Sequence, residues 1–308
     1  MAVLATTRRY NLAQRNLVRA VLLEYDLEGY TVGLLCQDVT AAADAADAGE
    51  QLVLEVGHGA TLEQAFYRAE QRLTYEADYK LCEYVLLCGN PSKALLQQYL
   101  DFLISDSTKG KLSAYLYAIN RSVSKFAAVS DEKGEHFADW IETLREHKAQ
   151  CPRVYDSYSS AIVVPILSAQ DTERSARPTG AWLMGNDNAL LRLGENEAQM
   201  MYLLLQRCRE VEFFIQGKQI VLELQAISFE RCEPKGGLCM TIYSTTPSVA
   251  QISELQTQLK QLVKQVMTTC ENDMEELLRL EYYNRMTGAG DAEEMEVDFK
   301  VLSAGMRF

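Results

Sequence analysis

The fold is decided by the stretch from Gly57 to Ile119. It reads Gly-His-Gly-Ala-Thr-Leu-Glu-Gln-Ala at positions 57–65 and Tyr-Lys-Leu-Cys-Glu-Tyr-Val-Leu-Leu-Cys-Gly-Asn at 79–90. It continues with Tyr-Leu-Asp-Phe-Leu-Ile-Ser-Asp at 99–106 and closes with Leu-Ser-Ala-Tyr-Leu-Tyr-Ala-Ile at 112–119. The short apolar run from Tyr84 to Cys88 is typical of a strand buried on both faces. Residues 114–119 predict a second strand.

Two helices are predicted around the first of these strands. Thr61 with Gln64 forms a capping box, so a helix should begin at Leu62. Ser92 follows a turn-forming Gly-Asn-Pro and can cap the second helix. The apolar faces are predicted from 3.6-residue spacing: Leu62, Ala65, Phe66, Ala69 and Leu73 in the first helix, and Leu95, Leu96, Tyr99 and Leu103 in the second. If the two strands are parallel neighbours, the crossover should be right-handed.

The order of these elements resembles the C subunit of bacterial spore germinant receptors, the Ger(x)C family. In that family a G-x-T-L-x-x-A helix start leads to a buried strand, a helix carrying L-D-F-L-x-x-D, and a second strand. The matching residues here begin at Gly59, at Tyr84, at Leu100 and at Ala114. A weaker likeness covers residues 181–197, and in element order the resemblance extends from Leu17 to Met306.

The resemblance implies a non-enzymatic lipoprotein subunit that acts in spore germination with membrane-embedded receptor subunits of the A and B types. It implies a place on the outer face of the inner spore membrane, held there by an N-terminal lipid. Family members carry a lipidated Cys just before a segment like Thr7-Arg8-Arg9, whereas the first cysteine here is Cys36. We therefore expect the anchor to have been removed from this chain; the alternative is a member that lacks one.

Composition sets limits on the partners. The chain has 308 residues, a formal net charge of −13 and a pI near 4.8. This acidic balance argues against nucleic-acid binding, which needs a basic surface, and against charge-driven docking on anionic lipid. The longest apolar runs are far shorter than the roughly 20 residues of a membrane span.

The rest of the first two thirds alternates strands and helices. Residues 17–24 and 30–37 predict a hairpin around Asp26-Leu-Glu-Gly29, and residues 52–56 predict a third strand. Residues 40–50 predict a loop or, alternatively, a short helix, and residues 124–135 predict a linker. A helix bearing Phe137, Trp140, Ile141 and Leu144 should follow. Residues 161–167 predict a strand, and Pro165 places that strand at the edge of a sheet or gives it a bulge. After it, the sequence predicts a charged, flexible segment at 168–180, a hairpin around residues 185–188 and a helix at about 197–207.

The last third has its own pattern. Residues 211–215, 220–229, 238–243 and a final segment around Val297, Phe299 and Val301 predict strands. Residues 249–283 predict one long amphipathic helix lying across a sheet, with Leu255, Leu259, Leu262 and Val266 buried and Gln256, Lys260 and Lys264 exposed. The predicted architecture is α+β, with small, largely antiparallel sheets and packed helices. The predicted domains are 1–123 (N-terminal α/β), 124–207 (middle helix and hairpin) and 208–308 (sheet with the long helix).

No residue pattern points to catalysis. The segment Gly57-His-Gly59 lacks the further glycines and the Lys of a phosphate loop, so it predicts a turn. His136 and His147 are three helical turns apart, too far to share a metal. Asp187 lacks the partners of a calcium loop, and residues 157–160 lack the nucleophile elbow. We therefore predict no catalytic, cofactor-binding or metal-binding residues.

Cysteines and tyrosines leave two structural alternatives open. Cys36, Cys82, Cys88, Cys208 and Cys270 lie in apolar surroundings and are expected to be free and buried. Cys232 and Cys239 flank a hairpin-like turn and could form a disulfide, or could remain free. Most tyrosines are expected in the core, although Tyr282 and Tyr283 could belong to an interface.

The predicted function is therefore a non-enzymatic germinant-receptor subunit. The alternative is a soluble extracytoplasmic ligand-binding protein with the same fold and no receptor partners.

Overall fold

The computed structural model describes residues 15–37, 52–132, 136–159, 161–168, 177–185, 190–205, 210–215, 218–231, 238–244, 249–269 and 296–301. Several predicted features lie outside these residues. They are the 40–50 segment, the long helix beyond residue 269, Asp187, Cys208, Cys232, Cys270, Tyr282 and Tyr283.

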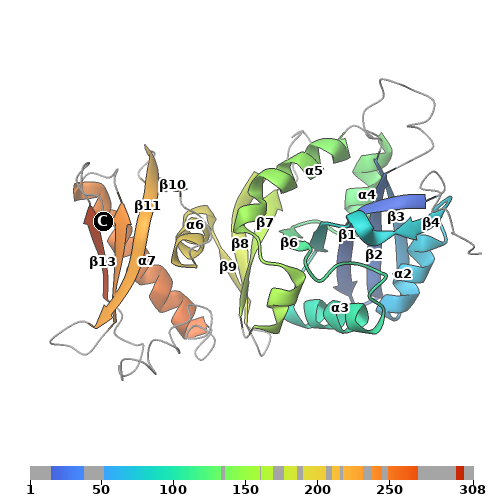
Figure 1. The fold of residues 1–308 in the computed structure, drawn as a ribbon, viewed down its shortest axis with the longest axis horizontal. Helices are drawn as coiled ribbons and strands as arrows, with labels where there is room; N and C mark the ends of the chain where they lie inside the picture. The colour runs from blue at the N-terminus through green and yellow to red at the C-terminus, as the bar shows by residue number, and fades with distance from the viewer. Residues whose placement is uncertain are drawn as a thin grey trace, which may run out of the picture.

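Nine strands of the described residues form one sheet (Figure 1). Its order is β3-β2-β1-β5-β6-β7-β8-β9, and the short strand β4 pairs beside β5 on β1. The strands are β1 (Arg15–Asp26), β2 (Gly29–Gln37), β3 (Leu52–Gly59), β4 (Glu76–Asp78), β5 (Tyr84–Cys88), β6 (Tyr115–Ile119), β7 (Ile162–Ser168), β8 (Arg177–Met184) and β9 (Leu190–Leu193).

The centre of this sheet is parallel and its two ends are antiparallel. β1, β5, β6 and β7 run in the same direction. On one side β1 forms the predicted hairpin with β2, and β3 adds antiparallel to it. On the other side β8 and β9 continue from β7 as antiparallel neighbours, which confirms the predicted hairpin there. The two strands predicted around the Leu100–Phe102 helix are parallel neighbours, β5 and β6.

Helices cover both faces of the central strands (Figure 1). One core contains the buried sides of α2 (Leu62–Glu70) and α3 (Lys93–Ser105). The other contains those of α4 (Val123–Glu132) and α5 (His136–His147). β5 serves both cores, because Val85 and Leu87 face α3 whereas Tyr84, Leu86 and Cys88 belong to the α5 side. This is the two-faced burial that a continuous apolar run indicates.

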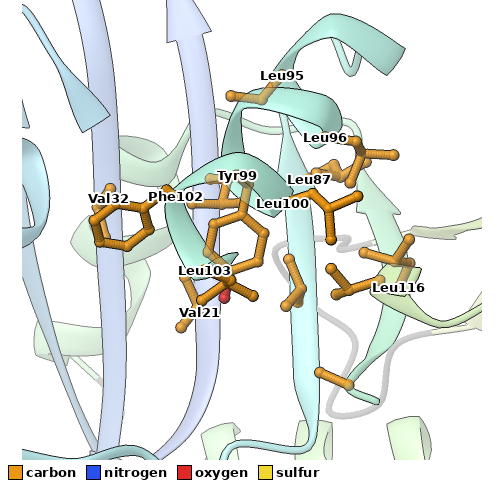
Figure 2. Close-up of a cluster of buried hydrophobic side chains, with 14 of the residues drawn as sticks. Val21, Val32, Leu87, Leu95, Leu96, Tyr99, Leu100, Phe102, Leu103 and Leu116 are labelled. Carbon is orange, nitrogen blue, oxygen red and sulfur yellow. The ribbon is translucent and has the colours of Figure 1, made fainter. Parts of the chain in front are cut away.

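The core around α3 is drawn in Figure 2. Leu95, Leu96, Tyr99 and Leu103 are buried as predicted, and Leu100 and Phe102 join them. Figure 2 shows these side chains pointing toward strands that carry Val21, Val32, Leu87 and Leu116. The α2 stripe meets the same core, where the rings of Phe66 and Phe102 stack 4.7 Å apart between centroids.

One prediction for the middle of the chain is wrong. Residues 124–135 were expected to be a linker, yet α4 occupies 123–132. Val123 and Phe126 of that helix are buried in the core, and Ala127 packs against it. Of the two alternatives predicted for the strand with Pro165, the bulge is the one observed: β7 lies between β6 and β8, and its pairing with β8 shifts register after Ile166. Pro165 is tolerated because the ladder between β6 and β7 begins only at Ile166, and a bulge follows in the pairing with β8.

A second, four-stranded sheet contains β10 (Glu210–Ile215), β11 (Lys218–Arg231), β12 (Leu238–Ser244) and β13 (Glu296–Val301), in that order. β10, β11 and β12 are antiparallel, and β13 joins β12 in parallel. The helix α7 (Val249–Thr269) contacts β13. Its residues Leu255, Leu259 and Leu262 are buried and Lys260 is exposed, as predicted, while Gln256 is only half-exposed. Val266 and Lys264 have side chains outside the described set.

The α+β class is confirmed, although the first sheet is larger and more mixed than the small antiparallel sheets expected. The first sheet continues from β6 to β7, and the division into domains at 123/124 and 207/208 stays a prediction. The helix α6 (Glu195–Leu204) contacts β8 and also β10 (Figure 1). Of the helices that the structure describes, none has the length and apolarity to cross a bilayer.

Candidate functional site

The Gly57-His-Gly59 segment is strand, not the predicted turn. Its three residues complete β3, where His58 pairs with Thr31 of β2. The glycines permit close packing of α2 on the strand: a Cβ on Gly57 would lie 2.2 Å from the Ala65 carbonyl oxygen. A Cβ on Gly59 would lie 2.6 Å from the Ala65 amide nitrogen. The glycines of this motif are therefore required by helix–strand contact.

The helix cap confirms the start of α2 at Leu62. The Thr61 hydroxyl accepts a hydrogen bond from the Gln64 amide at 3.3 Å. The Gln64 side chain reaches back one residue further than in a standard capping box, accepting from the Ala60 amide at 3.3 Å. Arg68, one helical turn on, donates to the His58 carbonyl at 2.7 Å. These contacts join α2 to the end of β3.

The Leu100–Asp106 motif divides into core residues and one loop-forming residue. Leu100, Phe102 and Leu103 are buried, whereas Asp101 is exposed and accepts from Gln97. Asp106 caps the end of α3, and its Oδ1 accepts from the Thr108 amide at 3.1 Å and the Thr108 hydroxyl at 2.5 Å. Those hydrogen bonds lower the pKa of Asp106. The carboxylate thereby shapes the turn that carries Lys109.

That turn borders a surface cleft of about 920 Å³. The cleft lies between the end of α2, the β4 segment with the 3-10 turn η2 (Tyr79–Leu81), and the loop joining α3 to β6. Its charged lining residues, taken from four separate parts of the chain, are Arg15, Glu70, Glu76, Asp78, Lys80, Lys109 and Lys111.

Glu70 is the centre of the first polar group in the cleft. The Lys109 ammonium donates to its two carboxylate oxygens at 2.6 and 2.7 Å, and the Tyr79 hydroxyl donates to Oε1 at 2.8 Å. Glu70 and Lys109 retain only 19% and 27% side-chain exposure, so this ion pair is partly desolvated. Burial, together with the Glu70 charge, raises the pKa of Tyr79 well above its usual range, so its hydroxyl keeps its proton.

Asp78 is the centre of the second polar group. It is buried, with Oδ2 3.4 Å from the Arg15 guanidinium and Oδ1 accepting from the Lys80 amide at 2.9 Å. Arg15 also lies 3.4 Å from Glu76, which is largely exposed. The cleft thus presents paired charges of both signs, which suits recognition of a small polar or zwitterionic molecule.

The predicted chemical candidates do not meet at one place. His58 Nδ1 lies 2.9 Å from the Thr31 hydroxyl, away from the cleft residues. His147 is half-buried, and desolvation lowers its pKa. Ser157 is buried and donates to the Val154 carbonyl at 2.6 Å, so its hydroxyl is used internally. Within the described part of the chain, no three His, Cys, Asp or Glu residues lie together as a metal site would need.

Cys36, Cys82 and Cys88 are free and buried, as predicted. Burial raises the pKa of each thiol, to about 12 for Cys82, so none is an activated nucleophile. Cys151, in less apolar sequence, is also a buried thiol outside any disulfide. The pairing of Cys232 with Cys239 lies outside the described residues and stays a prediction.

Sequence reasoning missed the cleft. Arg15, Glu70, Asp78 and Lys109 have no shared motif, and they converge only because β1 pairs with β4 while α3 packs beside α2. The one residue of the sequence motif that pointed toward the cleft is Asp106, whose side chain forms the turn that carries Lys109.

No family model matches this chain. No curated protein matches it either. Among solved structures it is similar to one described as the crystal structure of the GerBC protein, with 11% sequence identity and a TM-score of 0.43. The alignment covers 92% of this chain and 96% of that one. At this identity and TM-score the likeness carries no argument about function.

Proposed function

We propose that this chain is a non-enzymatic subunit of a nutrient germinant receptor, of the Ger(x)C type. In this proposal it stands on the outer face of the inner spore membrane, tethered by an N-terminal lipid. It acts there with membrane-embedded subunits of the A and B types.

The observation that carries the proposal is the ordered motif between Gly57 and Ile119. Each piece of the motif has a structural role. Gly57 and Gly59 allow α2 to pack closely on β3, and Leu100 and Phe102 are buried in the core. Asp106 forms the turn at the cleft. A chain that keeps all these pieces in order is best explained as a relative of the proteins that its sequence resembles.

The test uses spores in which the native gene is deleted and then restored. Restoration with the lipid-anchored form should recover germination by nutrients, and the protein should fractionate with the inner spore membrane. Germination by a trigger that needs no nutrient receptor is the control and should not change. Cross-linking in these membranes should capture multi-pass partner subunits.

The contrary outcomes are distinct. Full recovery by an unanchored form would make the tether dispensable. A deletion without any effect on nutrient germination would overturn the receptor assignment itself.

The 920 Å³ cleft favours a second candidate, a ligand-binding protein that acts without receptor partners. Its paired Glu70–Lys109 and Asp78–Arg15 groups are suited to a small polar solute. In that case the purified chain should bind solute saturably, and no multi-pass protein should co-purify with it.

A further inference from the structure

A second, smaller cavity lies at the carboxyl edge of the first sheet. Its volume is about 280 Å³, and it is lined by Asn120, Arg121, Ser168, Thr179 and Arg192. Asn120 and Arg121 directly follow β6, and Ser168 ends β7, its parallel neighbour. In sheets with parallel strands and helices on both faces, ligands bind outside these carboxyl ends.

The lining has an unusual charge for this protein. Two of the five residues are arginines and none of the described lining residues is acidic, in a chain of net charge −13. The other three contribute two hydroxyl groups and one amide. A guanidinium presents a fork of N–H donors that matches the geometry of carboxylate and phosphate oxygens. The set of donors therefore matches a small oxyanion.

The backbone is distorted where it contributes Thr179. In the ladder between β7 and β8, Ile166 is opposite Gly180 and Leu167 is opposite Pro178, so Thr179 is left without an opposite residue. Gly180 has φ +151°, and a Cβ there would lie 2.2 Å from the Leu193 carbonyl oxygen. Such bulges re-aim side chains beside binding sites. Here the bulged residue lines the same cavity as Arg192 of β9.

The two arginines reach the cavity from separate, ordered positions. The Arg121 carbonyl accepts a hydrogen bond from the Gly89 amide at 2.8 Å, which joins the end of β6 to that of β5. Arg192 is opposite Trp182 in the ladder between β8 and β9. Both backbones are therefore held by the sheet, so binding an anion needs no rearrangement of a loop.

We propose that this cavity binds a small oxyanion, a phosphate or carboxylate group, between Arg121 and Arg192, with Thr179 and Ser168 as hydrogen-bonding partners. The site is separate from the Glu70–Lys109 cleft. It is independent of whether the chain is a receptor subunit.

The test is calorimetric titration of the full chain with inorganic phosphate and, separately, with acetate, at constant ionic strength set with chloride. Saturable binding of at least one anion is expected. Arg192→Gln should weaken it by about tenfold or more, since the neutral amide cannot replace the charge-assisted hydrogen bonds of the guanidinium. Arg72→Gln, an exposed arginine outside both cavities, is the matched control and should leave binding unchanged.

A second variant protects the test against misfolding. Thr179→Asp places a carboxylate beside the arginines at an exposed position, so it should abolish anion binding while the thermal unfolding midpoint is retained. Sedimentation with phosphatidylglycerol vesicles, compared with phosphatidylcholine vesicles, distinguishes the source of the phosphate. Vesicle binding lost in Thr179→Asp, without binding of free anions, would identify a lipid headgroup.

Two results would overturn the proposal. The first is the absence of saturable binding to free anions and to phosphatidylglycerol vesicles alike. The second is binding that Arg192→Gln and Thr179→Asp leave unchanged.

Discussion

Glu24 joins β1 to α4 through its carboxylate. It is near the end of β1, and its Oε2 accepts the Val123 amide of α4 at 2.8 Å, a favourable place for negative charge at a helix start. Burial is the main cause that raises the pKa of Glu24, and the nearby Asp26 adds to it. The Val123 hydrogen bond and the charges of His58 and Lys125 oppose that rise without cancelling it.

The raised pKa of Glu24 predicts how stability depends on pH. The folded chain holds this proton more tightly than the unfolded chain, so the contribution is fully present below the ordinary pKa of 4.5. It is lost as pH rises through the folded-state value. Glu24→Gln keeps an acceptor for Val123 without the titration. As pH rises above about 4.5, we expect the unfolding free energy of Glu24→Gln to fall less than that of the wild type.

Urea unfolding at a series of pH values between about 4 and 8 measures this difference. The control is Glu28→Gln, at an exposed carboxylate in the β1–β2 turn. Parallel curves for Glu24→Gln and the wild type would contradict the prediction.

A substitution at Gly57 tests the contact between α2 and β3. Gly57→Ala forces a methyl group to within 2.2 Å of the Ala65 carbonyl oxygen, so helix and strand must separate. We expect a loss of about 1–3 kcal/mol or more in unfolding free energy. Gly194→Ala is the comparison, since its new methyl would meet only the Glu197 side chain at 3.5 Å. An equal or smaller loss for Gly57→Ala would show that α2 does not pack so closely.

At the scale of elements, sequence patterns were sufficient where burial is continuous or periodic. Tyr84–Cys88 was predicted to the residue, and the α5 face of Phe137, Trp140, Ile141 and Leu144 is buried as expected. α4 was missed because its apolar side is short, marked by Val123, Phe126 and Ala127 and followed by polar residues.

The limits of sequence reasoning are clearest in Gly57-His-Gly59 and in the cleft. Glycines are common in turns, and only the approach of α2 explains them within a strand. The cleft could not be predicted, because Arg15, Glu70 and Lys109 meet through long-range packing alone.

The α7 face gives an element-scale prediction. Leu262 is 2% exposed, so Leu262→Ala should cost about 2–5 kcal/mol through lost burial and the cavity left behind. Lys260→Ala, on the exposed side of the same helix, should stay within about 0.5 kcal/mol of the wild type. Chemical unfolding followed by circular dichroism measures both. A loss below about 0.5 kcal/mol for Leu262→Ala would mean that the helix face is assigned wrongly.

At the scale of the whole molecule, the two sheets form separate hydrogen-bonded ladders, and α6 contacts strands of both. The chain has two tryptophans, Trp140 in α5 and Trp182 in β8. Tryptophan fluorescence therefore reports the first sheet and its helices, whereas circular dichroism reports both sheets.

We predict that the two sheets unfold in separate transitions. Leu262→Ala should then lower the midpoint of one circular dichroism transition and leave the fluorescence midpoint unchanged. The fluorescence and dichroism curves of the wild type should likewise differ. If all curves coincide and shift together in the variant, the chain unfolds as one cooperative unit.

The central position of β1 has a consequence for the order of assembly. This strand precedes the other described strands of its sheet, yet its parallel partner β5 follows only after β2, β3, α2 and β4. Until then, the edge of β1 that will pair with β5 has no partner, and its Ala20–Leu23 segment awaits burial on both faces. Pairings between residues distant in sequence are slow to form, and unpaired apolar edges favour aggregation. Folding of this chain is therefore expected to depend on protection of β1 by chaperones or by rapid completion of the chain.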